Sequence, residues 1–187
     1  MADFLLAYRK TIEIDEGGFR LHDVPGDAGG KTFAGIAYNF NRNWPGWQYV
    51  FSGKGNSLEC RRLVEKFYRS TYWRSLQGDA IHHQAIAEAL FNFAMNSTIS
   101  NSVRYVQYCL DCEPDGRLGP VTLDAISKLE GDGVELLLSQ FVLMRIGHRV
   151  KRIRKDPSQL KFAGGWLLRD LRALDEFMNV AQFFGLS

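Results

Sequence analysis

Cysteine, proline and long apolar runs are scarce in this chain of 187 residues. Its 3 cysteines include one Cys-x-x-Cys pair, Cys109 and Cys112, but no second pair that would complete a metal site. We therefore expect free thiols, no metal and no cofactor. The longest apolar stretches are well short of the roughly 18 residues that a membrane-spanning helix needs, so the sequence predicts no transmembrane segment.

A marked excess of charge of either sign is also missing, because the formal net charge is only +2. Whole-molecule electrostatics therefore do not indicate a polyanionic partner. Positive residues nevertheless crowd the segment from Arg145 to Lys161, where Asp156 is the single acid. Two interpretations stay open for this segment: a solvated helix face, or a surface attracted to an anionic membrane or to nucleic acid. No nucleic-acid-binding motif accompanies the basic run, so we expect no nucleic-acid partner.

The length allows one substantial core, and 45% hydrophobic with 24% charged residues is an ordinary globular composition. Apolar residues recur at helical spacing through most of the chain, so the expected fold class is mainly α. Asp3 is expected to cap the first helix, and Asn56 with Glu59 resembles a capping box for the second. The predicted helices cover residues 3–16, 56–73, 84–95, 100–110, 121–129, 134–154 and 166–177.

Residues 19–47 lack the helical period, and repeated glycines and prolines divide them into turns and short extended pieces. We expect a long loop or a small β-hairpin here, directly after the first helix. A loop of this length inside a compact domain is uncommon unless it carries function. It is therefore the first place to look for chemistry.

Glu16 is the candidate acid at the start of this loop. It lies at the carboxyl end of the first predicted helix, where the unpaired carbonyl groups carry a partial negative charge that disfavours a carboxylate. The pKa of a partly buried glutamate at that position should rise, which suits a general acid in glycosidic cleavage. The alternative is an ordinary surface glutamate before the helix-ending glycines Gly17 and Gly18.

Asp27 and Thr32 are candidates for a second catalytic role. They flank a flexible glycine pair in the loop and could hold and polarise a water molecule on the far side of the sugar from Glu16, as an inverting mechanism requires. Acidic residues in turns also suggest a calcium loop, but their spacing does not match an EF-hand.

An ordered set of loop residues resembles the signature of glycoside hydrolase family 108, a family of N-acetylmuramidases. The set runs Glu16-Gly17-Gly18-Phe19, Asp23-x-Pro25-Gly26-Asp27-x-Gly29-Gly30-x-Thr32 and Gly35-Ile36. A second set resembles the region of this family that is described as a predicted peptidoglycan domain. It comprises Asn96, Gln107, Asp115-Gly116-x-x-Gly119-Pro120-x-Thr122 and Phe162-x-x-Gly165-Trp166-Leu167-x-Arg169.

The resemblance implies a lysozyme-like helical fold that hydrolyses the β-1,4 bond between N-acetylmuramic acid and N-acetylglucosamine, with Glu16 as the essential acid. Similarity to phage-type lysozymes adds Asp27 and Thr32 to the catalytic set. We expect the catalytic region over residues 1–90 and the predicted peptidoglycan domain over residues 91–187, packed as one compact body in a monomer.

The first ten residues lack the pattern of a secretory signal. We therefore expect synthesis in the cytoplasm, followed by action on peptidoglycan glycan strands in the periplasm or cell wall after nonclassical or holin-dependent release.

The substrate-binding residues expected from the loop and the resemblance are Asp23, Tyr38, Trp44 and Asn96. An aromatic ring offers apolar contact to a sugar face, although Trp44 could equally belong to the core. This chain also departs from the family. Asn92 stands where an Asp is usual and Ala34 where a Tyr is usual.

Two other functions remain open. A noncatalytic peptidoglycan-binding module is suggested by the turn-rich Asp115–Pro120 segment, which resembles turns of wall-binding helical domains. A lysis or secretion accessory protein, in weak contact with an anionic membrane, is suggested by the basic segment from Arg145 to Lys161.

Overall fold

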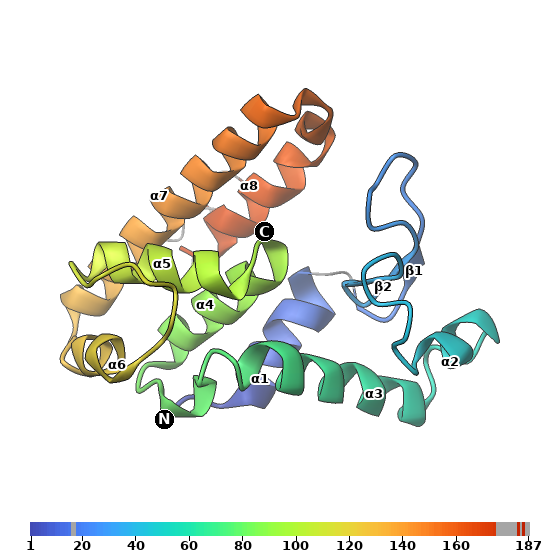
Figure 1. Cartoon of the computed structure of the whole chain (residues 1–187), viewed down its shortest axis with the longest axis horizontal. Coiled ribbons are helices and arrows are strands. Elements are labelled where there is room, and N and C mark those ends of the chain that lie inside the picture. The colour runs from blue at the N-terminus through green and yellow to red at the C-terminus, as the bar shows by residue number, and fades with distance from the viewer. Residues whose placement is uncertain (16–17, 175–182, 184, 186–187) are drawn as a thin grey trace. The chain divides into compact units, whose positions relative to one another are not determined.

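The computed structural model describes residues 1–15, 18–174, 183 and 185. Helices dominate this part of the chain, and a small antiparallel sheet follows the first helix (Figure 1). The predicted mainly α class, with a small β structure after the first helix, is therefore confirmed. The chain divides into two compact units: residues 3–79 form the N-terminal unit, and residues 1–2 with 80–187 form the C-terminal unit.

The first helix begins as α1 (Phe4–Tyr8) and continues as a π-helix, η1 (Arg9–Asp15). The Asp3 side chain caps it, as predicted, because Oδ1 accepts the backbone N–H groups of Leu5 at 2.6 Å and Leu6 at 3.2 Å. The expected left-handed glycine at its carboxyl end is Gly18, whose φ is 70°.

Three short strands form an antiparallel sheet in the order β1 (Leu21–His22), β2 (Thr32–Phe33) and β3 (Ile36–Ala37). Thr32 pairs with Ala37, and Phe33 pairs with Ile36, so Ala34 and Gly35 are the two turn residues between β2 and β3. Their φ values of 47° and 76° are both positive, which is the requirement of the type I′ turn that matches the natural twist of a hairpin.

The N-terminal unit continues through α2 (Trp47–Phe51), α3 (Leu58–Tyr68) and a second π-helix, η2 (Arg69–Trp73). The capping box expected at Asn56 is wrong. The cap is Ser57, whose Oγ accepts the backbone N–H of Cys60 at 3.2 Å. Its position one residue later keeps the hydroxyl within reach of the third helical amide.

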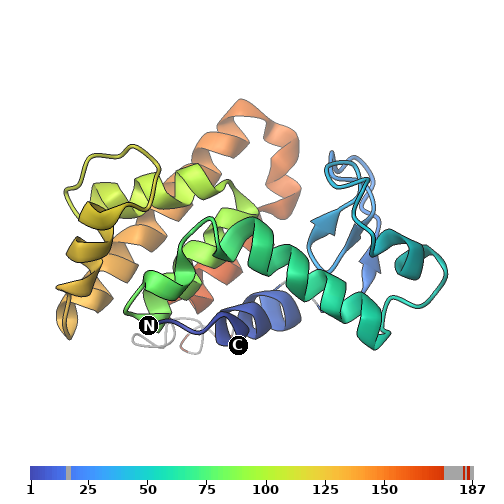
Figure 2. The same ribbon diagram turned by 60° about the horizontal axis from the view of Figure 1, so that its bottom comes forward.

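Aromatic rings supply much of the core of the N-terminal unit. Phe4 on α1 packs edge-to-face on Trp73 with 5.6 Å between ring centroids, and Tyr8 meets Tyr68 of α3 at 6.2 Å. These contacts hold α1 alongside α3 and η2 (Figure 2). The Tyr68 hydroxyl also donates to the Ala34 carbonyl oxygen at 2.7 Å, which ties the hairpin turn to the same core.

The regular secondary structure of the C-terminal unit is all helical in the part that the structure describes. A 3-10 turn, η3 (Gly78–Ala80), crosses the division between the units. The α7 and α8 helices lie side by side (Figure 1). The elements are α4 (Gln84–Asn96), α5 (Ile99–Cys109), α6 (Pro120–Ser127), α7 (Asp132–Lys155), the 3-10 helix η4 (Pro157–Phe162) and α8 (Ala163–Arg172).

The buried face of α4 is centred on Leu90 and Phe93, as predicted, but Ala85 and Ala89 are only half-buried. The Phe93 ring contacts Tyr105 of α5 at 5.6 Å and Phe141 of α7 at 5.7 Å between centroids, so it joins three helices. None of the helices that the structure describes is long and apolar enough to span a bilayer.

Candidate active site

The described part of the first helix runs to the residue before the expected acid. The last residue of η1 is Asp15, and Glu16 follows it directly in the sequence. The Gly18 N–H donates to the Ile12 carbonyl oxygen at 3.0 Å, so the chain turns back on the helix end. Glu16 and Gly17 themselves lie outside the described residues.

Asp27 occupies a tight turn between β1 and β2. Its backbone N–H donates to the Val24 carbonyl oxygen at 3.0 Å, and the Gly30 N–H donates to the Asp27 carbonyl oxygen at 3.1 Å. The side-chain Oδ1 accepts the Gly29 N–H at 2.9 Å. These bonds fix the half-buried carboxylate on its turn. Its second oxygen, Oδ2, accepts no hydrogen bond from the part of the chain that the structure describes.

Thr32 lies at the start of β2, and its side chain is half-buried. Its Oγ1 donates to the Gly30 carbonyl oxygen at 3.1 Å, while Gly30 itself donates to the Asp27 backbone. The structure therefore joins Asp27 and Thr32 through Gly30. Because the threonine proton is used in this bond, the hydroxyl oxygen keeps its acceptor capacity for a water molecule.

Asp23 and Tyr38 lie in the same unit as Asp27. Asp23 is exposed in the connection that follows β1. Tyr38 is half-buried, and its ring packs edge-to-face against Trp47 at 5.2 Å and Phe51 at 5.5 Å. Neither residue has an established role, and both remain candidates for substrate contact.

Trp44 does not fit the sugar-stacking role that we expected from the sequence. Only 8% of the residue is exposed, and its ring packs against Trp47 at 5.2 Å and Phe33 at 6.5 Å. A Cβ placed on Gly46 would lie 2.1 Å from the ring, so backbone also covers it. Trp44 therefore belongs to a small core inside the loop. The exposed area of its ring is too small for a pyranose to stack on it.

Asn96 lies in the C-terminal unit, at the end of α4. Its Nδ2 donates to the Asn92 carbonyl oxygen at 3.0 Å, and its Oδ1 accepts from Arg169 Nη1 of α8 at 2.6 Å. Both ends of the side-chain amide therefore have protein partners. This geometry gives Asn96 a structural role between α4 and α8, and substrate binding by this residue stays a prediction.

Gln107 organises the turn-rich segment that the resemblance singled out. Its Nε2 lies 2.7 Å from Asp115 Oδ1 and 3.1 Å from Thr122 Oγ1, and its Oε1 accepts the Gly116 N–H at 2.9 Å. Hydrogen bonds from the Arg117 N–H and from Gln107 lower the pKa of Asp115. The motif residues thus form one hydrogen-bond network, which accounts for their spacing without a ligand.

Two arginines of the basic segment are not on the surface. Arg145 and Arg149 are buried beside Asp170 of α8, with Arg145 Nη2 at 2.6 Å and Arg149 Nε at 3.6 Å from its oxygens. The expectation of an anionic-membrane contact through the whole Arg145–Lys161 segment therefore needs correction. The helical repeat explains why these arginines are buried, because they lie on the same face of α7 as the buried residues Leu138 and Phe141.

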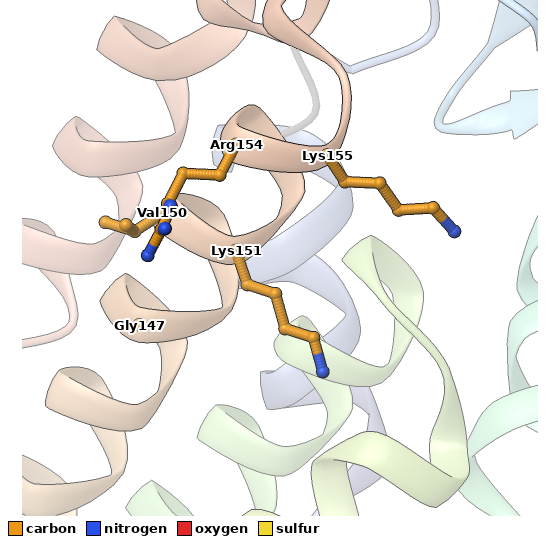
Figure 3. A pocket seen from close by; sticks show the side chains of 5 residues that line it. All are labelled: Gly147, Val150, Lys151, Arg154 and Lys155. Atoms are coloured by element: carbon orange, nitrogen blue, oxygen red, sulfur yellow. The ribbon is translucent and has the colours of Figure 1, made fainter.

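A basic pocket remains on the exposed side of α7. Its volume is about 450 Å³, and Figure 3 shows the side chains around it. We define the basic pocket by its lining residues, Gly147, Val150, Lys151, Arg154 and Lys155.

The three cysteines are free, as predicted. Burial raises the pKa of the Cys109 thiol to about 11. This thiol is therefore protonated at neutral pH and is not a nucleophile there.

Comparison with known proteins supports the sequence resemblance. Residues 9–97 match the family described as glycosyl hydrolase 108, and residues 101–171 match the family described as a predicted peptidoglycan domain. The chain therefore carries a family 108 glycosyl hydrolase region followed by a peptidoglycan domain. At family level, it is a glycoside hydrolase that acts on peptidoglycan.

The fold has a similar solved structure, titled "Structure of Brucella abortus SagA". The TM-score is 0.68 with 19% sequence identity, over 96% of this chain and 97% of that chain. The mainly α, lysozyme-like fold expected from the resemblance is therefore confirmed. Comparison with curated proteins found no match.

Proposed function

We propose that this chain cleaves the β-1,4 bond between N-acetylmuramic acid and N-acetylglucosamine, with Glu16 as the general acid. The observation that carries the proposal is the family match over residues 9–97, which includes Glu16. In the described part of the chain, the first helix runs to Asp15, the residue before Glu16. The carbonyl groups at a helix carboxyl end disfavour a further negative charge. A glutamic acid that keeps its proton near neutral pH can then donate it to the leaving oxygen.

Asp27 and Thr32 supply the other half of the proposed reaction. A water molecule between them would donate one hydrogen bond to Asp27 Oδ2 and one to Thr32 Oγ1. Its lone pair is then free to attack the anomeric carbon as the glycosidic bond breaks. Asp27 takes the proton that the attacking water loses, and Glu16 gives its proton to the leaving sugar oxygen, which is the balance of an inverting glycosidase.

The first test is mass spectrometry of the fragments released from purified peptidoglycan. The wild-type protein is expected to release fragments with reducing N-acetylmuramic acid ends, and Glu16→Gln is expected to release none. Glu59→Gln is the matched control, because it makes the same chemical change at an exposed residue of the same unit. Lysis by folded Glu16→Gln would remove Glu16 from the mechanism.

The same experiment separates the alternatives. Intact glycan with wild-type protein bound to it would indicate a noncatalytic peptidoglycan-binding module. Fragments with reducing N-acetylglucosamine ends would place the activity on the other glycosidic bond of the strand. A protein that neither binds nor cuts peptidoglycan would favour an accessory role in lysis or secretion.

A further inference from the structure

Phe40 is an exposed aromatic residue beside the proposed catalytic turn. It follows β3, and 71% of its surface is exposed. Its ring stacks on no other ring of the described residues, so it does not belong to the aromatic core that contains Trp44 and Trp47. Isolated exposed apolar side chains are common on proteins, so exposure alone gives Phe40 no role.

The backbone on both sides of Phe40 is fixed. The Asn39 N–H donates to the Gly29 carbonyl oxygen at 3.1 Å, and the Asn39 side chain donates to the Ala28 carbonyl oxygen at 3.0 Å. On the other side, the backbone and side-chain N–H groups of Asn41 both donate to Ala37, at 3.1 and 3.0 Å. The ring is therefore presented to solvent by an ordered segment, which reduces the entropy cost of binding a ligand against it.

The Phe40 ring and the Asp27 carboxylate both lie near Gly29. A Cβ built on Gly29 would lie 2.9 Å from Ala37 Cβ, 3.5 Å from Asp27 Oδ1 and 3.7 Å from Phe40 Cε2. The carboxylate and the ring edge therefore both lie close to a residue that has no side chain. Gly29 does not have a positive φ, so backbone conformation does not demand a glycine there. Its missing side chain lets the Ala37 methyl group, the carboxylate and the ring edge approach the same residue.

We infer that Phe40 is a stacking platform for a pyranose ring of the glycan strand, beside the sugar that Asp27 serves. A pyranose has one apolar C–H face and polar hydroxyl edges, so an aromatic ring next to a carboxylate complements both. This inference rests on the proposed function for the identity of the sugar. It also assigns the exposed aromatic contact to Phe40, since the ring of Trp44 is covered.

The test compares Phe40→Ala, Phe40→Tyr and Leu58→Ala by their steady-state kinetics on soluble glycan strands from peptidoglycan. Phe40→Ala is expected to raise KM and lower kcat/KM by roughly tenfold, the loss of one stacking contact. Phe40→Tyr keeps the ring and is expected to stay within about twofold of wild type. Leu58→Ala is the matched control, because Leu58 is an exposed apolar residue of the same unit, 59% exposed at the start of α3.

A binding measurement makes this inference separable from the proposed mechanism. In the Glu16→Gln background, Phe40→Ala is expected to weaken binding to the same strands by a similar factor, and Phe40→Tyr is expected to restore it. If the wild-type protein does not cleave the strands but its binding depends on the Phe40 ring, the proposed function fails and the platform stands. Cleavage and binding that are unchanged in folded Phe40→Ala would overturn the platform and leave the proposed function standing.

Discussion

Arg145 and Asp170 form an ion pair with 2.6 Å between Nη2 and Oδ1, and neither side chain has any exposed surface. Asp170 also faces Arg149, so one carboxylate balances two guanidinium groups. Burial lowers the pKa of Arg149 to about 10, although Asp170 opposes the shift, which indicates how costly these buried charges are. Asn92 contributes a neutral acceptor, its Oδ1, to Arg145 at 3.0 Å.

Asp170→Asn is expected to destabilise the protein by about 3–5 kcal/mol, because two buried arginines lose their counter-charge. The measurement is the free energy of unfolding from urea titration. The control is Asp124→Asn, which removes an exposed partner of Lys128 and is expected to cost no more than about 1 kcal/mol. Equal losses in the free energy of unfolding for the two substitutions would show that the buried carboxylate stabilises the protein no more than an exposed one.

Gly116→Ala is expected to destabilise the Gln107 network by about 2–3 kcal/mol. Gly116 has a φ of 80°, and its added Cβ would lie 2.5 Å from Ser100 Oγ. Gly119→Ala is the matched control, since its φ is −94° and no atom lies within 4 Å of the added Cβ. Thermal unfolding of both variants tests the prediction, and a similar melting temperature for the two would contradict it.

Acidification below pH 6.5 is expected to weaken the C-terminal unit through His148. Burial, then the positive charges of Arg149, Arg152 and Lys151, lower the pKa of His148 in the folded protein. Its Nδ1 lies 3.0 Å from the Tyr105 hydroxyl. The unfolded chain takes up a proton first, near its ordinary pKa of about 6.5, so this stability is present above pH 6.5 and declines as the pH falls toward the folded pKa.

The measurement is the urea midpoint of wild type and of His148→Gln, each across the range from neutral to mildly acidic pH. The substitution is expected to make the urea midpoint fall less steeply as the pH is lowered. The same slope in both proteins would assign the acid sensitivity to other groups.

Thr32→Val is expected to lower kcat by about 10- to 100-fold if Thr32 positions the attacking water, because valine keeps the shape and removes the oxygen. Thr32→Ser keeps an Oγ and is expected to retain most activity. Rates of glycan cleavage, with thermal unfolding as the check on folding, distinguish the two variants. Full activity of Thr32→Val would exclude the hydroxyl from the mechanism.

The basic pocket on α7 is expected to support weak binding to anionic lipid. Replacing Lys151, Arg154 and Lys155 together by glutamine is expected to reduce binding to phosphatidylserine vesicles at least about tenfold at low ionic strength. High salt is expected to remove the difference by screening. Vesicle sedimentation measures both, and unchanged binding in the triple variant would reject this surface as the contact.

Sequence patterns predicted the first helix, its Asp3 cap and the small β structure after it, because caps, helical period and glycine-rich turns are local signals. They did not predict the π-helical form of residues 9–15, which depends on packing rather than on local propensity. The cap at Ser57 was missed by one residue because neighbouring Asn and Ser offer similar acceptors.

The candidate site was predicted in part. The order of residues in the loop predicted Asp27 and Thr32 as candidate residues. In the structure, hydrogen bonds connect both of them to Gly30. Composition could not tell whether Trp44 faces sugar or core, since an aromatic ring suits both. The burial of Arg145 and Arg149 could have been predicted, because both lie at the helical spacing of the buried residues of α7. Their charge led to the prediction of a surface position instead. Phe40 was missed because a single exposed ring has no sequence signature.

The two-residue turn between β2 and β3 also determines which face of the hairpin carries the Thr32 hydroxyl. Phe33 and Ile36 face the core while Thr32 and Ala37 take the other face, because side chains alternate along each strand. An insertion or deletion of one residue at Ala34 would shift the strand register and exchange these faces. The length of the hairpin turn thus determines whether the Thr32 hydroxyl or the Phe33 ring lies on the face away from the core, beside Gly30.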